Sequence, residues 1–339
     1  MSQRDPTDTC PTDFAVSVSH TTKTFSQWQR SNTASSIIKN LIKPEKRVIT
    51  ALDDVSFDIR GGEFVAYAGP NGAGKSTTMK LLCGMLLPNS GTLSVLGLSP
   101  HIQRVPLMRK LGVLFGNRTE LWWDHPIIQS FEWKRVVWDI PRPLYEKNLA
   151  MVTELLDIGG LLKTFARELS LGQRMRCDLA MMLLHSPQVI LLDEPTLGLD
   201  VVAKRQMIDF LKTINRENGV TILVTSHDMD DLEEMAQRIL MVSDGKVAFD
   251  GGFAALRDIT GSPTRVSVTM AGGAPPILPA AMLLGSENGV YEYETDLAAL
   301  PITTLLRQLS ETDGVQDVEI KKAPIEQVIA TLYLRWNAG

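Results

Sequence analysis

A glycine-rich segment near residue 70 carries the residue types that bind phosphate. Its members are Gly69, Pro70, Asn71, Gly72, Ala73, Gly74, Lys75, Ser76 and Thr77. Glycines let backbone N–H groups turn toward phosphate oxygens, and the positive end of a following helix favours the same anion. Lys75 can reach the β- and γ-phosphates of ATP, and the Ser76 hydroxyl can take one position around Mg²⁺. The segment therefore predicts a site for ATP and Mg²⁺.

Two acids and a histidine follow later apolar runs and suit hydrolysis of the bound nucleotide. Asp193 and Glu194 come directly after the run 189–192, and His227 follows the run 221–225. Asp193 suits the Mg²⁺ shell, usually through water, and Glu194 can polarise the water that attacks the γ-phosphate. His227 can contact the γ-phosphate and orient that water. We therefore predict Lys75, Glu194 and His227 as catalytic residues, and Ser76 and Asp193 as metal ligands.

The elements around these residues are those that such a site requires. The apolar strand 64–68 leads into the phosphate loop, and the helical run 76–86 leaves it. Short continuous apolar runs at 189–192 and 221–225 are typical of buried parallel strands. Asp244-Gly245 predicts a hairpin turn, and Gly219 predicts the end of a helix. Further strands are expected at 14–18, 51–59, 112–115, 239–243 and 246–249, and helices at 174–184 and 201–217.

A short motif precedes the helix expected at 174–184. It reads Leu169-Ser170-Leu171-Gly172-Gln173, in which Ser170 and Gln173 match a capping box. A bare cap of this kind is common. Here it stands between the phosphate loop and the two-acid strand, and Thr196-Leu197-Gly198-Leu199-Asp200 follows that strand.

In this order the motifs resemble those of the ATP-binding cassette (ABC) ATPases, over about residues 14–260. The resemblance implies an α/β P-loop NTPase with a mainly parallel sheet core, an antiparallel β subdomain and an inserted helical subdomain. It also implies ATPase activity coupled to transmembrane transport. The helical subdomain would occupy about 117–180.

Composition divides the remaining chain. Residues 1–13 read as a disordered tail, and 26–48 as an insertion in the ATP-binding domain. Ile37, Ile38, Leu41 and Ile42 recur at helical spacing there, which suits a helix packed on its own domain or on a membrane or partner. Residues 261–339 read as a small α/β domain, with loose chain at the glycines and prolines of 272–276, helices at 300–309 and 325–334, and a strand at 318–321.

The resemblance also implies a partner cassette. In this family two cassettes sandwich two ATP molecules, so Ser170, Gly172 and Gln173 would cap the nucleotide held by the second ABC subunit, a copy or a close paralogue. Leu199 and Asp200 match the interface loop of the family. Phe25 stands where an aromatic residue stacks on adenine.

Two departures from the family pattern concern the signature and the segment after strand 112–115. In the signature, Leu171 stands at the position where glycine is the commonest residue. Asn117 stands where a glutamine usually ligates Mg²⁺ and senses the membrane partner. Around it, the stretch 115–126 with Trp122 and Trp123 resembles a bacterial export-type subgroup, whose membrane permease subunits are encoded separately. If exposed, the tryptophans would suit a groove that receives a helix of such a subunit.

Bulk composition narrows the remaining alternatives. The chain has 339 residues, a net charge of −5 and three cysteines, Cys10, Cys83 and Cys177, without metal-ligand spacing. Nucleic-acid binding is therefore not expected, and a reducing compartment fits. No run is long and apolar enough to span a membrane. The resemblance to ABC transporter ATPases implies a peripheral protein on the cytoplasmic face of the membrane. The alternatives are a non-catalytic regulatory module and a soluble ABC ATPase acting on ribosomes or DNA.

Overall fold

The computed structural model describes residues 14–28, 46–116, 118–260, 264–272, 275–295, 300–322, 325, 328, 329 and 332. The chain divides into two compact units, Met1–Asp250 and Gly251–Gly339. The tail 1–13, the helix expected at 37–42 and Asn117 lie outside the described residues.

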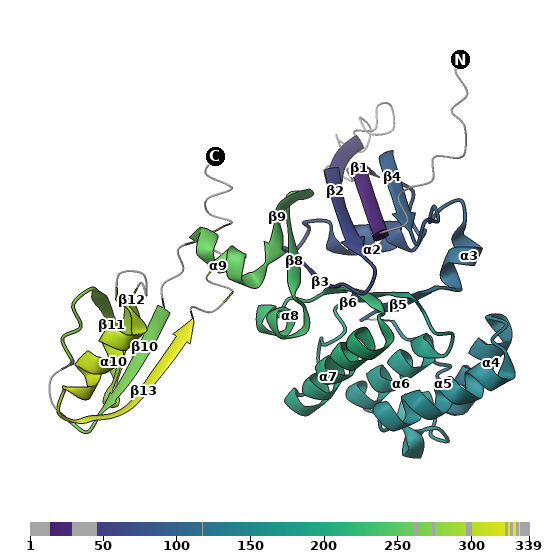
Figure 1. Ribbon diagram of the computed structural model, residues 1–339. Helices are drawn as coiled ribbons and strands as arrows, with labels where there is room; N and C mark the ends of the chain where they lie inside the picture. The colour runs from purple at the N-terminus through teal and green to yellow at the C-terminus, as the bar shows by residue number, and fades with distance from the viewer. Residues whose placement is uncertain are drawn as a thin grey trace, which may run out of the picture. The chain divides into compact units, whose positions relative to one another are not determined.

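A six-stranded sheet is the centre of the first unit (Figure 1). Its strands lie in the order β5-β6-β7-β3-β8-β9, and the pairs from β5 to β8 are parallel. The strands are β3 (Phe64–Ala68), β5 (Leu111–Phe115), β6 (Val189–Asp193), β7 (Thr221–Thr225), β8 (Arg238–Ser243) and β9 (Lys246–Gly252). Asp244 and Gly245 both have positive φ, as the predicted hairpin turn between β8 and β9 requires. The mainly parallel core is thus confirmed.

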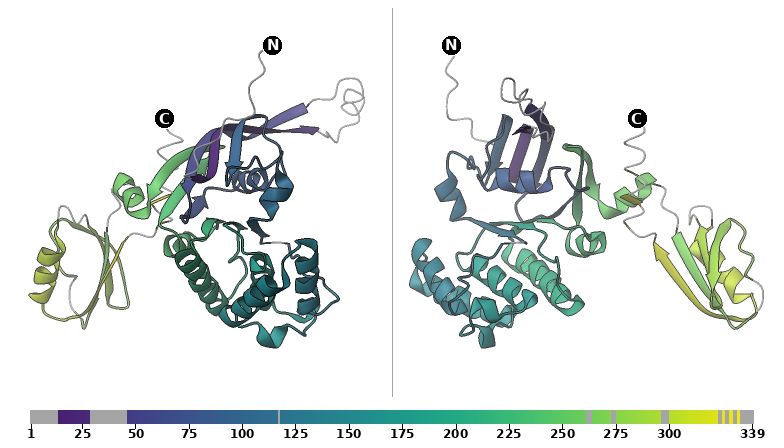
Figure 2. Two further views of the ribbon diagram at one scale, coloured as in Figure 1. Left: turned by 45° about the vertical axis from the view of Figure 1, so that its right-hand side comes forward. Right: turned by 180° about the vertical axis from the view of Figure 1, so that it is seen from behind.

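A three-stranded antiparallel sheet, in the order β2-β1-β4, forms the second layer of this unit (Figure 2). Its strands are β1 (Phe14–Trp28), β2 (Lys46–Arg60) and β4 (Ser90–Val95). The first two are longer than the predicted strands 14–18 and 51–59, because the residues beyond those runs continue the ladder from Thr24–Thr50 to Trp28–Lys46. The residues at both ends of the predicted insertion 26–48 therefore extend this hairpin.

The helices predicted at 76–86, 174–184 and 201–217 are present with altered ends, and further helices lie in the predicted helical subdomain. The helices at 104–108 and 229–235 were not predicted. The bounds of all these helices are α2 (Lys75–Leu82), α3 (Arg104–Met108), α4 (Ile127–Val137), α5 (Arg142–Leu155), α6 (Leu171–Leu183), α7 (Val201–Asn218) and α8 (Met229–Met235), with short 3₁₀ turns at Gly159–Leu161 and Ala166–Glu168. The helix predicted at 76–86 ends early because Gly84 adopts a φ of 69°. Gly219, at φ 65°, ends α7 as predicted.

The core explains the apolar runs. β3 and β7 are buried at all five positions, because the parallel sheet is covered on both faces. One cluster joins the two sheets and α2, and includes Val16, Ile59, Tyr67 and Leu82. Each fully buried side chain of this size stabilises the fold by about 1.5–3 kcal/mol.

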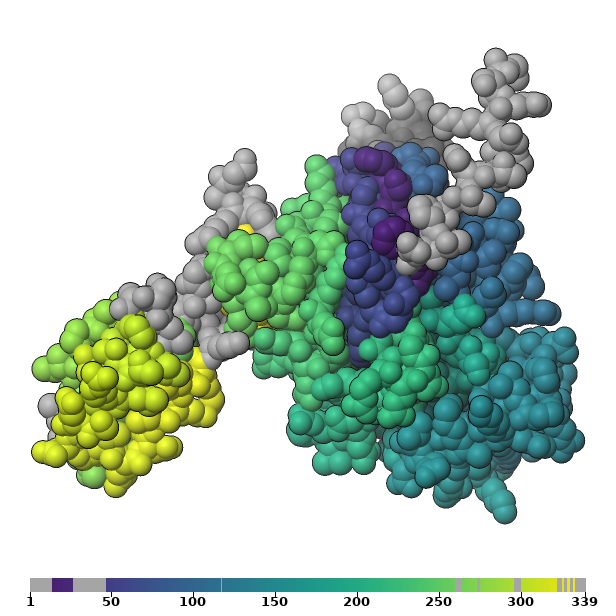
Figure 3. Space-filling model, in the orientation of Figure 1, coloured from purple at the N-terminus to yellow at the C-terminus, as the bar shows by residue number. Residues whose placement is uncertain are grey.

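The second unit contains a four-stranded antiparallel sheet in the order β11-β12-β10-β13. Its elements are α9 (Phe253–Thr260), β10 (Thr264–Met270), β11 (Ala281–Glu287), β12 (Val290–Thr295), α10 (Ile302–Ser310) and β13 (Val315–Lys322). In Figure 3 the yellow residues, which include α10 and β13, cover most of the visible face of this unit. The sequence reading missed β10, β11 and β12, since it took the glycines and prolines near 275 as marks of loose chain throughout. Of the helix expected at 325–334, residues 325, 328, 329 and 332 are described and helical.

Candidate nucleotide site

The phosphate loop joins β3 to α2 with a backbone that only glycine accepts at its ends. Gly74 is the N-cap of α2 at φ 106°, and no side chain caps the helix. A Cβ at Gly69 would lie 2.3 Å from the carbonyl oxygen of Val242, and one at Gly74 would lie 2.5 Å from that of Ala51. The loop is therefore pressed against β8 and β2, with the N–H groups of the first turn of α2 left for an anion.

Lys75 is held against its own loop. Its Nζ donates to the carbonyl oxygens of Gly69 (2.6 Å) and Pro70 (3.2 Å), and the side chain is buried. Burial lowers the pKa of the Lys75 ammonium, while the carboxylates of Glu194 and Asp193 act in the opposite direction. The loop and the two acids therefore form one electrostatic site.

The two acids stand at the end of β6, between its two neighbouring strands. Asp193 is in register with Phe115 of β5 and Thr225 of β7. The Thr225 hydroxyl donates to Asp193 Oδ1 at 2.7 Å. Glu194 has a φ of 58°, a left-handed conformation that is uncommon for a residue with a side chain. The chain therefore leaves β6 through a turn in which Glu194 has an uncommon left-handed backbone conformation.

His227 contacts the second acid directly. Its Nε2 lies 2.5 Å from Glu194 Oε1, and the two side chains are 47% and 21% exposed. A carboxylate and an imidazole in contact, both open to solvent, can hold and exchange a proton with a water molecule. The structure therefore brings Glu194 and His227 together, with Asp193 as the residue before Glu194.

The signature motif starts α6 as predicted. Ser170 Oγ accepts from the Gln173 N–H (3.2 Å), and Gln173 Oε1 accepts from the Ser170 N–H (3.0 Å). Leu171, which departs from the family pattern, lies close to Gly198. A Cβ added at Gly198 would lie 2.9 Å from Leu171 Cδ2, so this leucine packs on the loop that leads to α7.

The loop after the two acids ends at Asp200, which is exposed. Its side chain accepts from the Ala203 N–H at 2.8 Å and so caps α7. A Cβ at Gly172 would lie 3.2 Å from that of Ala203. In the described part of the chain, no hydrogen bond or ion pair joins the signature residues to the phosphate loop. The signature and interface-loop residues thus lie together, as a group separate from that loop.

Phe25 lies on β1, in register with Ile49 of β2, and the Lys23 ammonium stands 5.2 Å from its ring centre. Lys23 itself pairs with Leu52, whose side chain approaches Gly74. Phe25 therefore lies on β1, the strand paired with β2, and residues of β2 contact the phosphate loop.

Gly116 begins the segment after β5, which we call the lid loop (116–126). Its N–H donates to the Asp193 carbonyl at 2.7 Å. Farther along, the Thr119 hydroxyl and the Glu120 N–H both donate to Asp178 Oδ1 on α6, at 2.8 and 3.2 Å. Burial raises the pKa of this carboxyl to about 7. The lid loop is thus tied to both the acids and the signature helix.

The tryptophans of the lid loop are partly exposed, Trp122 by 37% and Trp123 by 50%. Trp122 lies against Trp133 of α4, with ring centres 5.6 Å apart, and Arg174 of α6 stands over Trp123 at 5.6 Å. A pocket of about 280 Å³ adjoins this region, and Met108, Val113, Phe115 and Glu120 are among its lining residues.

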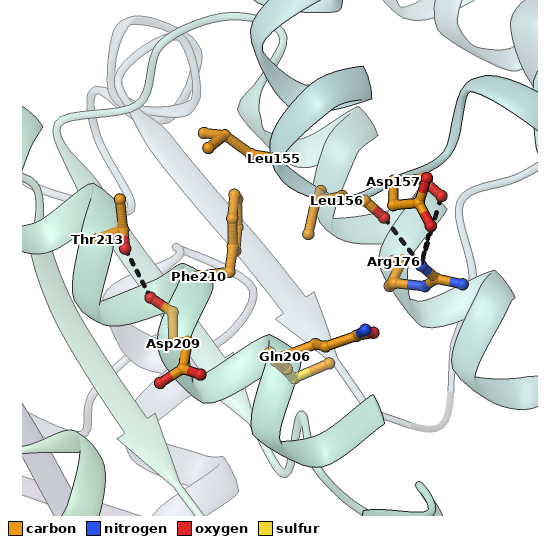
Figure 4. Close-up of a pocket in the computed structure, with 9 residues that line it drawn as sticks. Leu155, Leu156, Asp157, Arg176, Gln206, Asp209, Phe210 and Thr213 are labelled. Atoms are coloured by element: carbon orange, nitrogen blue, oxygen red, sulfur yellow. Dashed lines mark hydrogen bonds and ion pairs between the residues drawn. The ribbon is translucent and has the colours of Figure 1, made fainter. Parts of the chain in front are cut away.

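Another pocket, of about 290 Å³, lies between α5, α6 and α7 (Figure 4). On one side of it, Arg176 of α6 donates to the carbonyl oxygens of Leu156 (3.1 Å) and Asp157 (3.4 Å) at the end of α5. None of its lining residues is a predicted site residue. Arg176 therefore links α6 to the C-terminal end of α5 through hydrogen bonds.

The sequence analysis did not identify two residues of this region, Asp178 and Thr225, as part of the site. A signal existed for each. Asp178 interrupts the apolar face of a helix, where a buried carboxylate needs partners. Thr225 ends the run next to the two-acid strand, where parallel register can bring its hydroxyl beside Asp193.

Known proteins share this architecture. The family model described as ABC transporter matches residues 52–197. An uncharacterized ABC transporter ATP-binding protein of Bacillus subtilis is 33% identical over 210 residues, covering 62% of this chain and 67% of that protein. A putative ABC transporter ATP-binding protein of Clostridium acetobutylicum is 31% identical over 204 residues, covering 60% of this chain and 73% of that protein.

A solved structure gives the same fold. It is the dimeric structure of an ATP-binding cassette bound to ADP and phosphate, with a TM-score of 0.58 and 24% identity, covering 70% of this chain and 98% of the other. This likeness confirms the predicted P-loop fold class of the ATP-binding domain. The chain therefore belongs to the family of ABC transporter ATP-binding proteins, ATPases that power transport.

Proposed function

We propose that the chain hydrolyses Mg-ATP at the edge of the parallel sheet and transmits closure of a two-cassette dimer to membrane permease subunits. The observation that carries the catalytic part is the 2.5 Å contact between Glu194 and His227 beside Asp193. The ATP-binding domain would comprise about residues 14–260, with 261–339 as a separate small domain.

The phosphates would lie on the loop 69–77. The N–H groups at the start of α2 face no capping side chain, so they are free to receive phosphate oxygens. Lys75 would exchange its carbonyl partners for the β- and γ-phosphates. Phe25 would support the adenine ring, since its strand runs beside the residues that pack on Gly74.

The oxygen atoms of this site suit Mg²⁺. The hydroxyl of Ser76 is exposed at the first turn of α2, and Asp193 contributes a carboxylate. Mg²⁺ prefers a few protein oxygens completed by water and phosphate. The bound ion would neutralise charge on the β- and γ-phosphates. Asn117, outside the described residues, would add its amide oxygen from the lid loop.

Glu194 would accept a proton from the attacking water, and His227 would orient that water and the γ-phosphate. The contact between the two side chains supports this division, because each limits the rotamers of the other. Their partial exposure leaves access for water.

A second copy, or a close paralogue, would complete each site. Ser170, Gly172 and Gln173 stand at the N-terminus of α6, where N–H groups and the helix dipole favour an anion. Within one chain this group lies beside the interface loop at Leu199 and Asp200 rather than on the phosphate loop. Bound across a dimer, it would cap the γ-phosphate of the partner.

The lid loop would receive the permease. Trp122 and Trp123 are exposed enough to bury area against a short helix, and Arg118, Thr119 and Glu120 of the same loop line the 280 Å³ pocket. None of the helices in the described part of the chain combines the length and hydropathy that a membrane span needs. We propose a peripheral position on the cytoplasmic face, and export as the direction, on the resemblance of the stretch 115–126.

Replacing Glu194 by Gln tests the catalytic assignment. We expect turnover to fall by about a hundredfold or more, because the general base is lost while the shape of the side chain is kept. ATP affinity, measured by calorimetry, should remain. Glu217→Gln, in the exposed pair with Arg216, is the matched control. Unchanged phosphate release by Glu194→Gln would reject Glu194 as the base.

A further inference from the structure

Thr225 makes contacts that the sequence motifs do not account for. It is the last residue of β7, is fully buried and lies in register with Asp193. Its hydroxyl donates to Asp193 Oδ1 at 2.7 Å and accepts from the Glu194 N–H at 3.1 Å. A hydroxyl donates one proton and can accept through its lone pairs. The Thr225 hydroxyl therefore hydrogen-bonds to both acidic residues at the same time.

The hydroxyl is the one hydrogen-bond donor to the Asp193 carboxylate among the described residues. It engages Oδ1 and leaves Oδ2 without a bond from Thr225. Without this bond the carboxylate could rotate about its side-chain dihedrals, because the sheet fixes only the backbone of Asp193.

Glu194 depends on the same residue. Its N–H is shared between the hydroxyl and the carbonyl oxygen of Thr225, both at 3.1 Å. A non-glycine residue at φ 58° persists only where its surroundings hold it there. Gly116 of the lid loop packs closely against the same turn, because a Cβ at Gly116 would lie 2.4 Å from the Glu194 carbonyl oxygen. The lid loop therefore restricts movement of the Glu194 backbone.

We propose that Thr225 is a positioning residue for ATP hydrolysis, which sets the Asp193 carboxylate for the metal and the Glu194 turn for the attacking water. The inference rests on the proposed roles of Asp193 and Glu194. It assigns to β7 a function in the site besides carrying His227, since one hydroxyl couples the orientation of the metal ligand to that of the base.

β7 also offers a matched control. Thr221, its first residue, is buried like Thr225, and its hydroxyl accepts from the Gly62 N–H at 2.9 Å. Thr221→Val and Thr225→Val thus delete the same group from the two ends of one strand. Only the second change removes contacts with the acids.

The test compares Thr225→Val, Thr225→Ser and Thr221→Val in the full chain. We expect Thr225→Val to lower kcat by about tenfold to a hundredfold, as small misplacements of catalytic groups do. Thr225→Ser keeps the hydroxyl and should restore kcat close to the wild-type value. Thr221→Val should lower the thermal midpoint as Thr225→Val does, with kcat retained.

A second readout does not depend on turnover. With a non-hydrolysable ATP analogue, the added thermal stabilisation is followed as Mg²⁺ is titrated. Thr225→Val should need a higher Mg²⁺ concentration for half of the effect, whereas Thr221→Val should match the wild type. If Thr225→Val behaves like Thr221→Val in both kcat and Mg²⁺ response, the inference is wrong.

Glu194→Gln in the same series separates the two levels of the argument. An active Glu194→Gln would overturn the proposed function itself. An inactive Glu194→Gln together with a fully active Thr225→Val would overturn only the positioning role.

Discussion

The two larger sheets of this molecule use their strands in different ways. In the six-stranded sheet, β3 and β7 are buried at every position. In the four-stranded sheet, β10 alternates strictly between buried and partly exposed residues. A parallel sheet covered on both faces can present polar groups only where its strands end, whereas an antiparallel sheet with one open face presents them along its length.

The difference explains where chemistry is found. The phosphate loop, Asp193 and Thr225 stand at the carboxyl ends of three parallel strands, which meet at one edge of their sheet. On β10 the partly exposed positions are Arg265, Ser267 and Thr269, and they line an open hollow of about 440 Å³. Convergence of strand ends therefore concentrates function, and alternation along a strand disperses polar groups over a surface.

The largest effect should come from Lys75→Ala. Loss of the ammonium should lower kcat by about 10²–10³-fold, as removal of one charge-stabilising donor does. The folding midpoint should change little, since Lys75 bonds only carbonyl oxygens of its own loop in the described structure. Phosphate release and thermal unfolding measure the two effects, with the exposed Lys212→Ala as control. A large fall in the thermal midpoint of Lys75→Ala would contradict the view that residues at the strand ends serve catalysis while core residues serve stability.

Asp178 tests the cost of burying an acid in the helix α6. The pKa of its carboxyl is about 7 in the folded chain, against an ordinary value of 3.8. Between these values the folded protein keeps a proton that the unfolded chain has lost, so the stabilising contribution present at low pH disappears as pH rises toward 7. The difference reaches at most about 4 kcal/mol.

Asp178→Asn should therefore reduce the fall in unfolding free energy between pH 4 and pH 8, measured by urea titration across that range. Asp157→Asn, at a side chain 95% exposed, serves as the control. Parallel pH curves for wild type and Asp178→Asn would show that the acid is not strained by burial.

Leu305 and Leu306 compare the two faces of α10 in the second unit. Leu305 is fully buried, and Leu306 is 46% exposed. Leu305→Ala should cost about 2–5 kcal/mol of unfolding free energy, whereas Leu306→Ala should cost about 0.5 kcal/mol or less. Hydrogen exchange of the β10 and β12 amides would report the loss, and ATP affinity should be unchanged by either variant. Equal losses would mean that the helix does not cover the sheet as described.

Strand prediction succeeded in one region and failed in the other for a physical reason. Val189–Asp193 and Thr221–Thr225 are continuous apolar runs bounded by polar residues, and such runs stand out. Thr264–Met270 alternates, a signal that was present and overlooked, but Ala281–Glu287 does not alternate and carries a bulge. β11 pairs with β12 across the two-residue turn Asn288-Gly289, and both turn residues have positive φ. Asn-Gly is a local hairpin signal, which the sequence analysis also overlooked.

By itself, the sequence determined the phosphate loop, the order of the motifs, the Ser170 capping box and the glycine stops, because each depends on local backbone conformation or hydrogen bonds within a few residues. The tertiary structure decided the rest. It placed the Thr225 hydroxyl on Asp193, the lid loop on Asp178 and Leu171 against Gly198, since these contacts join residues 27 or more positions apart in the numbering. Register between strands and the close approach of separate loops arise only when the chain packs, so no spacing in the sequence could display them.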